Sequence, residues 1–323
     1  MTFRAFCKKP LASSASVPPA ATTRVCLQTQ KAKVRKGKER LRVDIKNDER
    51  SVFSGMKQRD LTDKEWVRLV PLLPPQKPHT GHPNKDHRQV MNGILWVVRS
   101  GAPWRDLPER YGPWSTVASR FYRWTKQGVW QGVFERVQTQ AQQAGRINWG
   151  IHFIDATIIR AHQQAAGAAH SSPEAEGLGR SRGGFSSKLH VRVDGDGQPL
   201  TFILTPGQQH ESTVAQQLLE QGAVATGQPG RPRRRPQRLV ADKGYSSHKF
   251  RAFLRRRGIR FTIPHLRHER FPGPFNPQRY RLRNRVERFF NRLKQNRRVA
   301  TRYEKRAVNY LAIVTFAAIR LWL

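Results

Sequence analysis

Apolar residues recur at helical spacing between about residue 61 and residue 144. Thr62 and Glu65 stand three positions apart at the start of this stretch, as in a helix capping box, and Pro74 and Pro75 would end the helix that begins there. Further helices are predicted over residues 87–100, 115–126 and 130–144. The pattern therefore predicts a small all-helical domain over residues 56–145.

The period changes from helix to strand at about residue 148. Residues 151–159 form a β-branched run, and the segment Asp194-Gly195-Asp196-Gly197 separates two apolar runs as the turn of a β-hairpin does. The other strands are predicted over 189–193, 200–205, 238–242 and 260–264, and the helices over 211–221, 246–257, 279–298 and 308–323. This order predicts an α/β domain over residues 146–323, a mixed sheet with flanking helices.

Residues 1–55 follow neither period. Residues 11–23 are rich in Ser, Ala and Pro, and residues 31–42 are rich in Lys and Arg. Such a composition buries little apolar surface, so we predict a basic, disordered extension. A second interpretation is that translation starts at Met56.

The charge of the chain indicates its class of partner. Lys and Arg number 60 against 22 Asp and Glu, which gives a formal net charge of +38. The 8 Trp and 16 Phe residues supply a core and so exclude a wholly disordered polycation. No apolar stretch is long enough to span a bilayer, which excludes a membrane channel. We therefore expect a folded protein that binds a polyanion, and nucleic acid is the default.

Two acids stand in or after apolar strands. Asp155 lies within the run of residues 151–159, where an ionised carboxylate is costly unless it has a partner, and Asp242 ends the predicted strand 238–242. Each alone is equally well explained as a strand-end Asp that caps a turn. Together they match the way in which paired carboxylates on neighbouring strands hold Mg²⁺, which prefers oxygen ligands.

A third acid lies in the predicted helix 279–298. Glu287 is the only acidic residue between Glu269 and Glu304. On a helix of 3.6 residues per turn, one narrow stripe contains Tyr280, Arg283, Glu287 and Lys294. The opposite, apolar side is predicted to be buried and contains Leu282, Val286, Phe289 and Leu293. The alternative is a solvated basic face on which Glu287 pairs with Arg283 one turn earlier.

Two further groups of arginines are candidate DNA contacts. Arg120 and Arg123 lie on the predicted helix 115–126, which is either part of a helix-turn-helix module or part of an ordinary bundle with a solvated basic face. Arg233, Arg234 and Arg235 lie in a Pro-rich loop just before the strand that ends on Asp242. That loop is either a flexible charged linker or an arm that follows DNA phosphates close to the active site.

These residues resemble the signature of a known family. Tyr280, Arg283, Glu287 and Lys294 reproduce the Tyr-Arg-Glu-Lys spacing of bacterial insertion-sequence DDE transposases of families four and five. Asp155 in Phe-Ile-Asp-Ala-Thr resembles their first acid, and Asp242 in Leu-Val-Ala-Asp-Lys-Gly-Tyr resembles their second. The segment 101–108 resembles the N-terminal module of family five, and the short interval from Asp242 to Glu287 also favours family five. The resemblance runs from about residue 61 to residue 323.

The resemblance implies a fold and an activity. It implies an RNase H-like catalytic domain in which Asp155, Asp242 and Glu287 hold two Mg²⁺ ions, with Mn²⁺ as a substitute, for phosphodiester cleavage and strand transfer. It implies that Arg283 and Lys294 contact DNA phosphates and that Tyr280 packs on or hydrogen-bonds to the same strand. The implied partners are double-stranded DNA, as terminal inverted repeats and target, and further copies of the chain in a homodimer or larger assembly on DNA. The implied location is the bacterial cytoplasm, at the nucleoid.

Two other functions remain open at this point. One is a DNA-binding protein that derives from a transposase and no longer catalyses. The other is an RNase H-like nuclease that cuts DNA without joining it. The presence of all three acids favours an active transposase over the first alternative, and an assay of strand transfer separates it from the second.

Overall fold

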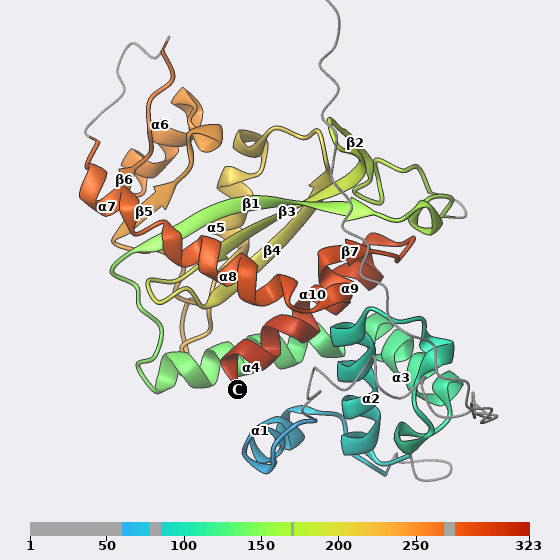
Figure 1. Ribbon diagram of the computed structural model, residues 1–323. Coiled ribbons are helices and arrows are strands. Elements are labelled where there is room, and N and C mark those ends of the chain that lie inside the picture. Colours follow the sequence, from blue (N-terminus) through green and yellow to red (C-terminus); the bar gives the residue numbers. More distant parts are fainter. Residues whose placement is uncertain (1–59, 78–84, 169–170, 268–274) are drawn as a thin grey trace, which may run out of the picture. The chain divides into compact units, whose positions relative to one another are not determined.

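The computed structural model of the protein describes residues 60–77, 85–168, 171–267 and 275–323 (Figure 1). The extension predicted over residues 1–55, and the alternative start at Met56, lie outside these residues. The described residues from Asp60 onward belong to one compact unit.

Four α-helices form the N-terminal part of this unit. They are α1 (Asp63–Leu69), α2 (His87–Ser100), α3 (Trp114–Lys126) and α4 (Val129–Gln143). The predicted helices are thereby confirmed, with one correction. The first α-helix ends at Leu69 rather than at Pro74, because a 3₁₀ turn that contains Pro71 replaces its last turn. Proline has no N–H to donate to an α-helical hydrogen bond.

The predicted capping box at the start of α1 is present. The Glu65 N–H donates to Thr62 Oγ1 at 3.3 Å, and the Thr62 N–H donates to Glu65 Oε2 at 2.8 Å. We expect Thr62→Ala to lower the free energy of unfolding by about 1 kcal/mol, since it leaves a helix N–H without its acceptor. Urea unfolding measures the change. Thr62→Ser retains the acceptor oxygen and should stay near wild type; equal losses in both variants would contradict a capping role.

Seven strands form one mixed sheet, as predicted. They are β1 (His152–Ala161), β2 (Gly179–Ser181), β3 (Gly184–Val193), β4 (Pro199–Pro206), β5 (Arg238–Ala241), β6 (Arg260–Thr262) and β7 (Thr301–Arg302). Strand β1 pairs antiparallel with β3 on one edge and parallel with β5 and β7 on the other. Strand β4 extends the sheet beyond β3, and β6 extends it beyond β5. The short strands β2 and β7 were not predicted.

The hairpin between β3 and β4 forms at the predicted turn. Asp194 Oδ1 accepts the N–H groups of Asp196 and Gln198, at 2.9 and 2.8 Å. Gly197 has φ of 81°, a left-handed conformation that glycine adopts without strain. The turn thus fixes the register in which β3 and β4 pair.

Helices cover both faces of the sheet. Alternate residues of a strand point to opposite faces, so Phe153 packs into one apolar cluster and Ile154 into another. The cluster around Ile154 contains side chains of α5 (Ala215–Gln221) and α6 (His248–Arg256). The cluster around Phe153 contains side chains of α4, of α8 (Asn284–Lys294) and of α10 (Ala307–Trp322). Asp155 is two residues beyond Phe153 and therefore faces α8.

The N-terminal helices share a core with the sheet domain. One cluster of buried apolar side chains runs through α2, α3, α4, β1, β3, α8 and α10. At its centre Trp130 of α4 meets Phe316 of α10 edge to face, with ring centroids 5.2 Å apart. The N-terminal helices thus pack on α10 as well as on one another. The domain boundary at residue 145 stays a prediction.

The prediction of one helix over residues 279–298 was wrong. The structure has α7 (Pro277–Arg281), α8 and α9 (Arg297–Ala300) in that range. Between α7 and α8 the backbone bonds span three residues, as in a 3₁₀ turn: Arg283 N–H donates to Tyr280 O, and Val286 N–H donates to Arg283 O. Leu282, predicted to be buried, is 37% exposed at this turn, whereas Val286, Phe289 and Leu293 are buried.

The predicted helix over residues 211–221 begins as a 3₁₀ turn, Glu211–Thr213, and becomes α5 only at Ala215. The predicted last helix is confirmed as α10. Within the described part of the chain, no helix is both long and apolar enough to cross a membrane.

Candidate active site

The register of β1 and β5 brings Asp155 and Asp242 to neighbouring strands. Ile154 pairs with Ala241 in the parallel ladder. Asp155 is the next residue of β1, and Asp242 is the first residue after β5. Asp155 is 8% exposed, and Asp242 is half-buried. The ladder therefore agrees with the prediction that these two carboxylates lie on neighbouring strands, but Asp155 lies inside β1 and only Asp242 follows the end of its strand.

Arg283 connects the first and third acids. Its Nη1 donates to Asp155 Oδ2 at 2.7 Å, and its Nη2 donates to Glu287 Oε1 at 2.6 Å. The side chain of Arg283 is 19% exposed and that of Glu287 is 52% exposed. The pairing of Glu287 with Arg283 that the sequence left as an alternative is present, but the same guanidinium also reaches the buried Asp155.

Two more side chains of the signature tie this segment to the sheet. Tyr280 Oη donates to Asp242 Oδ1 at 2.9 Å. Lys294 Nζ, at the end of α8, donates to Thr157 Oγ1 at 2.7 Å. The residues from Tyr280 to Lys294 thus contact β1 and the end of β5 with three polar side chains, even though the helix is broken, and two of these side chains bind the aspartates.

Burial and charge shift the ionisation of this cluster. Burial raises the pKa of Asp155 to about 6, against the lowering effects of Arg283 and of the Ala156 N–H. Burial, together with the hydrogen bond to Asp242, raises the pKa of Tyr280 to about 12, so its phenol stays a donor. Burial lowers the pKa of Lys294 from its ordinary value. A carboxyl with a raised pKa inside a group of charged side chains is typical of functional sites.

The raised pKa of Asp155 has a consequence for stability. The folded chain holds this proton more tightly than the unfolded chain, whose pKa is near 3.8, so ionisation destabilises the fold. The destabilisation caused by ionisation of Asp155 is absent below pH 3.8 and reaches its full size above about pH 6. We expect Asp155→Asn to gain roughly 2–3 kcal/mol relative to wild type between about pH 4 and 7.

Urea unfolding in EDTA at several pH values measures that difference. Asp106→Asn, on an exposed 3₁₀ turn, is the matched control and should show a smaller dependence on pH. The free energies of unfolding of Asp155→Asn and of wild type are compared at each pH. If their difference stays constant across this range, Asp155 ionises as freely in the folded chain as in water.

The donor set suits a divalent cation, but the acids are not gathered into a site. Within residues 60–77, 85–168, 171–267 and 275–323, no three His, Cys, Asp or Glu side chains stand close enough to hold a metal ion. Asp155 and Asp242 offer oxygen ligands on neighbouring strands, and Glu287 shares one guanidinium with Asp155. Carboxylate oxygens are ligands that Mg²⁺ and Mn²⁺ prefer, and Arg283 occupies the position between Asp155 and Glu287.

The arginines predicted to contact DNA differ in their surroundings. Arg233, Arg234 and Arg235 are exposed, with Arg233 stacked over the ring of Trp149 at 4.7 Å. Their loop precedes β5, whereas Asp242 follows it, so the loop and Asp242 lie at opposite ends of this four-residue strand. The two interpretations of this loop, a charged linker or an arm that follows DNA phosphates close to the active site, stay predictions.

The two arginines of α3 also separate. Arg123 is exposed. Arg120 is only 5% exposed and packs over the ring of Trp124, one turn further along the helix, at 5.3 Å. A buried guanidinium of this kind contributes to the core of the helices, and we leave Arg120 out of the interface proposed below.

Two side chains around the acids were not predicted from the sequence. Thr157, the partner of Lys294, lies two residues after Asp155 on the same strand face, a spacing that could have identified it. Glu211 raises the pKa of Asp155 by its charge, and its carboxylate lies where a Cβ atom at Gly244 would be. No sequence pattern links Glu211 to the turn after Asp242, because the contact joins two separate loops.

Comparison with known proteins gives consistent results. Residues 61–134 match the family model described as "Putative transposase of IS4/5 family". Residues 150–322, more than half of the chain, match the model described as "Transposase DDE domain". The match to each model begins close to the start of the corresponding predicted domain.

Relatives with similar sequences come from bacteria. The "Uncharacterized protein y4sN" of Sinorhizobium fredii is 40% identical over 108 residues, which cover 33% of this chain and 82% of that protein. The "Putative transposase for insertion sequence element IS6501" of Brucella ovis is 31% identical over 140 residues, which cover 43% of this chain and 99% of that protein.

A solved structure with some likeness is the "Mos1 transposase paired-end complex with left transposon end". It is 14% identical, with a TM-score of 0.23, and the match covers 59% of this chain and 62% of that one. A score this low does not define a shared fold, so the family rests on the sequence models and on the relatives. The chain belongs to the family of proteins with a transposase DDE domain, and its N-terminal helices match the IS4/5 group.

Proposed function

We propose that this protein is a DNA transposase that cleaves the ends of an insertion sequence and joins them to target DNA. The observation that carries the proposal is that one short segment contains Glu287 and contacts the other two acids. Arg283 donates to Asp155 and is paired with Glu287, and Tyr280 donates to Asp242. A structural helix on a sheet has no need of a guanidinium that bridges two carboxylates beside a third.

Asp155, Asp242 and Glu287 would be the ligands of Mg²⁺ or Mn²⁺. Bound there, two such ions would lower the pKa of an attacking water or 3′-hydroxyl and stabilise the charge on the leaving oxygen. Asp155 must give up its proton to be a ligand, so its raised pKa of about 6 in the metal-free chain makes metal binding weaken as the pH falls.

The basic side chains of the signature would position the DNA strand. A phosphodiester oxygen accepts hydrogen bonds as the two carboxylates that Arg283 contacts do. The planar guanidinium of Arg283 can therefore move from the acids to a phosphate. Lys294 lies on the same face and is held by Thr157. Tyr280 keeps its proton and orients Asp242.

The wider partners follow from charge and from the reaction. The net charge of +38 favours double-stranded DNA, both as terminal inverted repeats and as target. The exposed Arg123 and the loop of Arg233, Arg234 and Arg235 would contact phosphates at a distance from the acids. Because two ends are joined in one event, we propose a homodimer or larger assembly on DNA, in the bacterial cytoplasm at the nucleoid.

The test is cleavage and joining of labelled DNA that carries the repeats flanking the element. Full-length protein is incubated with Mg²⁺, with Mn²⁺ or with EDTA. We expect cleaved and joined products with either ion and none in EDTA. Cleavage without joined products would favour the nuclease, and binding without cleavage under all three conditions would favour the silent DNA-binding protein.

A further inference from the structure

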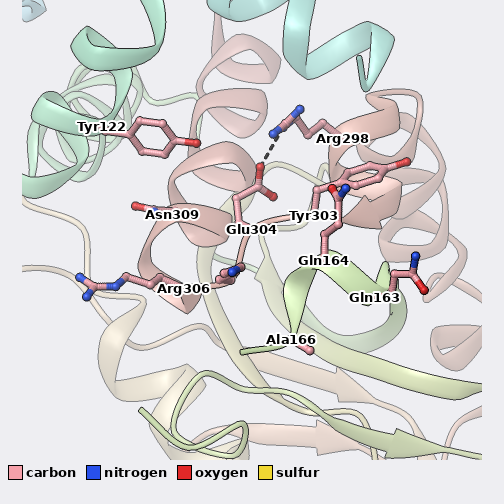
Figure 2. Close-up of a pocket in the computed structure, with 10 residues that line it drawn as sticks. Tyr122, Gln163, Gln164, Ala166, Arg298, Tyr303, Glu304, Arg306 and Asn309 are labelled. Carbon is pink, nitrogen blue, oxygen red and sulfur yellow. Dashed lines mark hydrogen bonds and ion pairs between the residues drawn. The ribbon is translucent and has the colours of Figure 1, made fainter. Parts of the chain in front are cut away.

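A second site lies away from the acids, in a pocket of about 800 Å³ (Figure 2). Its walls come from α3, from the 3₁₀ turn that follows β1, and from the chain between α9 and α10. The lining residues that matter here are Tyr122, Tyr303, Glu304, Lys305 and Arg306. The lining therefore combines aromatic rings, one carboxylate and basic side chains.

Glu304 is the unusual residue of this pocket. Its side chain is 3% exposed, and its Oε1 accepts from Arg298 Nε at 2.8 Å. Its Oε2 is buried and has no hydrogen-bond partner among the described residues. A buried carboxylate oxygen without a donor is costly to the fold. Such an atom in a pocket wall indicates that a ligand brings the donor.

Two tyrosines lie on either side of this carboxylate (Figure 2). Tyr122 Oη accepts from Trp104 Nε1 at 3.1 Å, which fixes the phenol of Tyr122. The ring of Tyr303 contacts the guanidinium of Arg298, 5.7 Å from its centroid, and the imidazole of His162, whose ring centroid is 5.2 Å away. Fixed aromatic rings beside a hydrogen-bond acceptor are what a nucleobase needs for stacking and recognition.

The mouth of the pocket is basic. Lys305 and Arg306 are exposed at the start of α10, a helix of 16 residues with no side-chain cap. The first N–H of this helix, on Ala307, already donates to Glu176 Oε2 at 2.5 Å. A phosphate would therefore contact Lys305 and Arg306 rather than that amide, with the helix dipole in its favour.

We propose that this pocket binds one nucleotide of a DNA strand, with its base out of the stack and its phosphate on Lys305 and Arg306. The inference rests on the proposed function, which supplies DNA as the partner. Glu304 selects for a base that presents amino and imino donors. Guanine presents two adjacent donors on its pairing edge. Thymine presents one N–H between two carbonyl oxygens that Glu304 repels.

The position of the pocket predicts which nucleotide binds. Strand β1 leads from Asp155 to Ala161, and the turn that lines the pocket follows. At roughly 3.3 Å per residue these strand positions span about 20 Å. With roughly 3.4 Å per nucleotide along a strand, the bound nucleotide lies about six positions from the phosphate that is cut.

The test measures binding of fluorescent oligonucleotides of about ten residues to the full chain, a length typical of single-strand sites. One oligonucleotide is oligo(dT), and the other contains one central guanine. EDTA prevents cleavage, and about 0.3 M salt suppresses contacts that do not depend on the base. We expect roughly tenfold tighter binding of the guanine oligonucleotide.

Two variants assign this preference to the pocket. Glu304→Gln keeps an oxygen that accepts from Arg298 and replaces the unpartnered Oε2 with an NH₂ group. It should therefore remove the preference for the guanine oligonucleotide. The exposed Glu135→Gln on α4 is the matched control and should keep it. Tyr303→Leu should weaken binding of the guanine oligonucleotide roughly tenfold through lost stacking. If a thermal scan shows that Glu304→Gln does not fold, the oligonucleotide affinities of wild type and of Tyr303→Leu still test the proposal.

The outcomes are distinct. Equal affinity of wild type for both oligonucleotides, or a preference that Glu304→Gln and Tyr303→Leu both retain, would overturn the proposal. Free dGMP serves as a competitor, and if it binds tightly while the guanine oligonucleotide does not displace it, the site takes free nucleotides and the assignment to DNA is wrong. Because EDTA is present throughout, failure of the cleavage assay leaves this result unaffected, and the reverse also holds.

Discussion

Glu287→Ala is expected to lower metal-dependent cleavage and joining by at least about 10³-fold. A carboxylate ligand helps to stabilise several kcal/mol of transition-state charge through the metal, and each 1.36 kcal/mol corresponds to roughly tenfold in rate. Stability should change little, because this side chain is 52% exposed and makes a surface pair with Arg283. The measurement is single-turnover cleavage of DNA that carries the element's ends, with Mg²⁺ and with Mn²⁺.

Two controls make this result specific. Glu135→Ala removes an exposed glutamate from another helix and should cleave as wild type does. Gel-shift binding of the same DNA by Glu287→Ala should be retained, since the change removes a negative charge. Undiminished cleavage by Glu287→Ala would show that Glu287 is not part of the active site and would contradict the transposase proposal.

Arg283→Ala is expected to lower the free energy of unfolding of the metal-free protein by about 3 kcal/mol. The change removes the cation from between Asp155 and Glu287 and leaves a buried carboxylate without its partner. Arg283→Lys should recover only part of the loss, because an ammonium group cannot donate to two carboxylates in a fixed fork. Urea unfolding in EDTA near neutral pH measures both variants.

The matched control is Arg288→Ala, an exposed arginine of the same helix, which should change stability by less than about 0.5 kcal/mol. On the proposed function, added Mg²⁺ should stabilise Arg283→Ala more than wild type, because Arg283 no longer competes for the acids. Equal destabilisation by Arg283→Ala and Arg288→Ala would show that the bridge contributes nothing to the fold.

Local patterns predicted the elements well where tertiary contacts agree with them. The helix over residues 87–100 and the hairpin at Asp194 to Gly197 were predicted from periodicity and turn residues, and both are present. The placement of Asp155 and Asp242 on neighbouring strands was also predicted, and the register that pairs Ile154 with Ala241 brings the two acids to the same level.

Other features depend on partners that a linear pattern does not contain. Leu282 fits the apolar stripe of a continuous helix, but the 3₁₀ turn that lets Tyr280 and Arg283 reach the aspartates rotates it toward solvent. Arg120 was read as a surface charge, and its spacing of one turn from Trp124 was the signal that it packs on that ring. Strand β7 has only two residues and pairs with the far end of β1, so no periodicity could reveal it.

The core shared by α4 and α10 has a consequence for how the chain is made. A ribosome that adds roughly 5–20 residues per second reaches α10 about 10–30 s after it completes α4. Throughout that interval the apolar faces of the first helices lack the surface around Phe316 and are open to chaperones and proteases. A nascent chain therefore cannot complete the core of its first helices before α10 is made, and a chain that stops before α10 leaves those apolar faces uncovered.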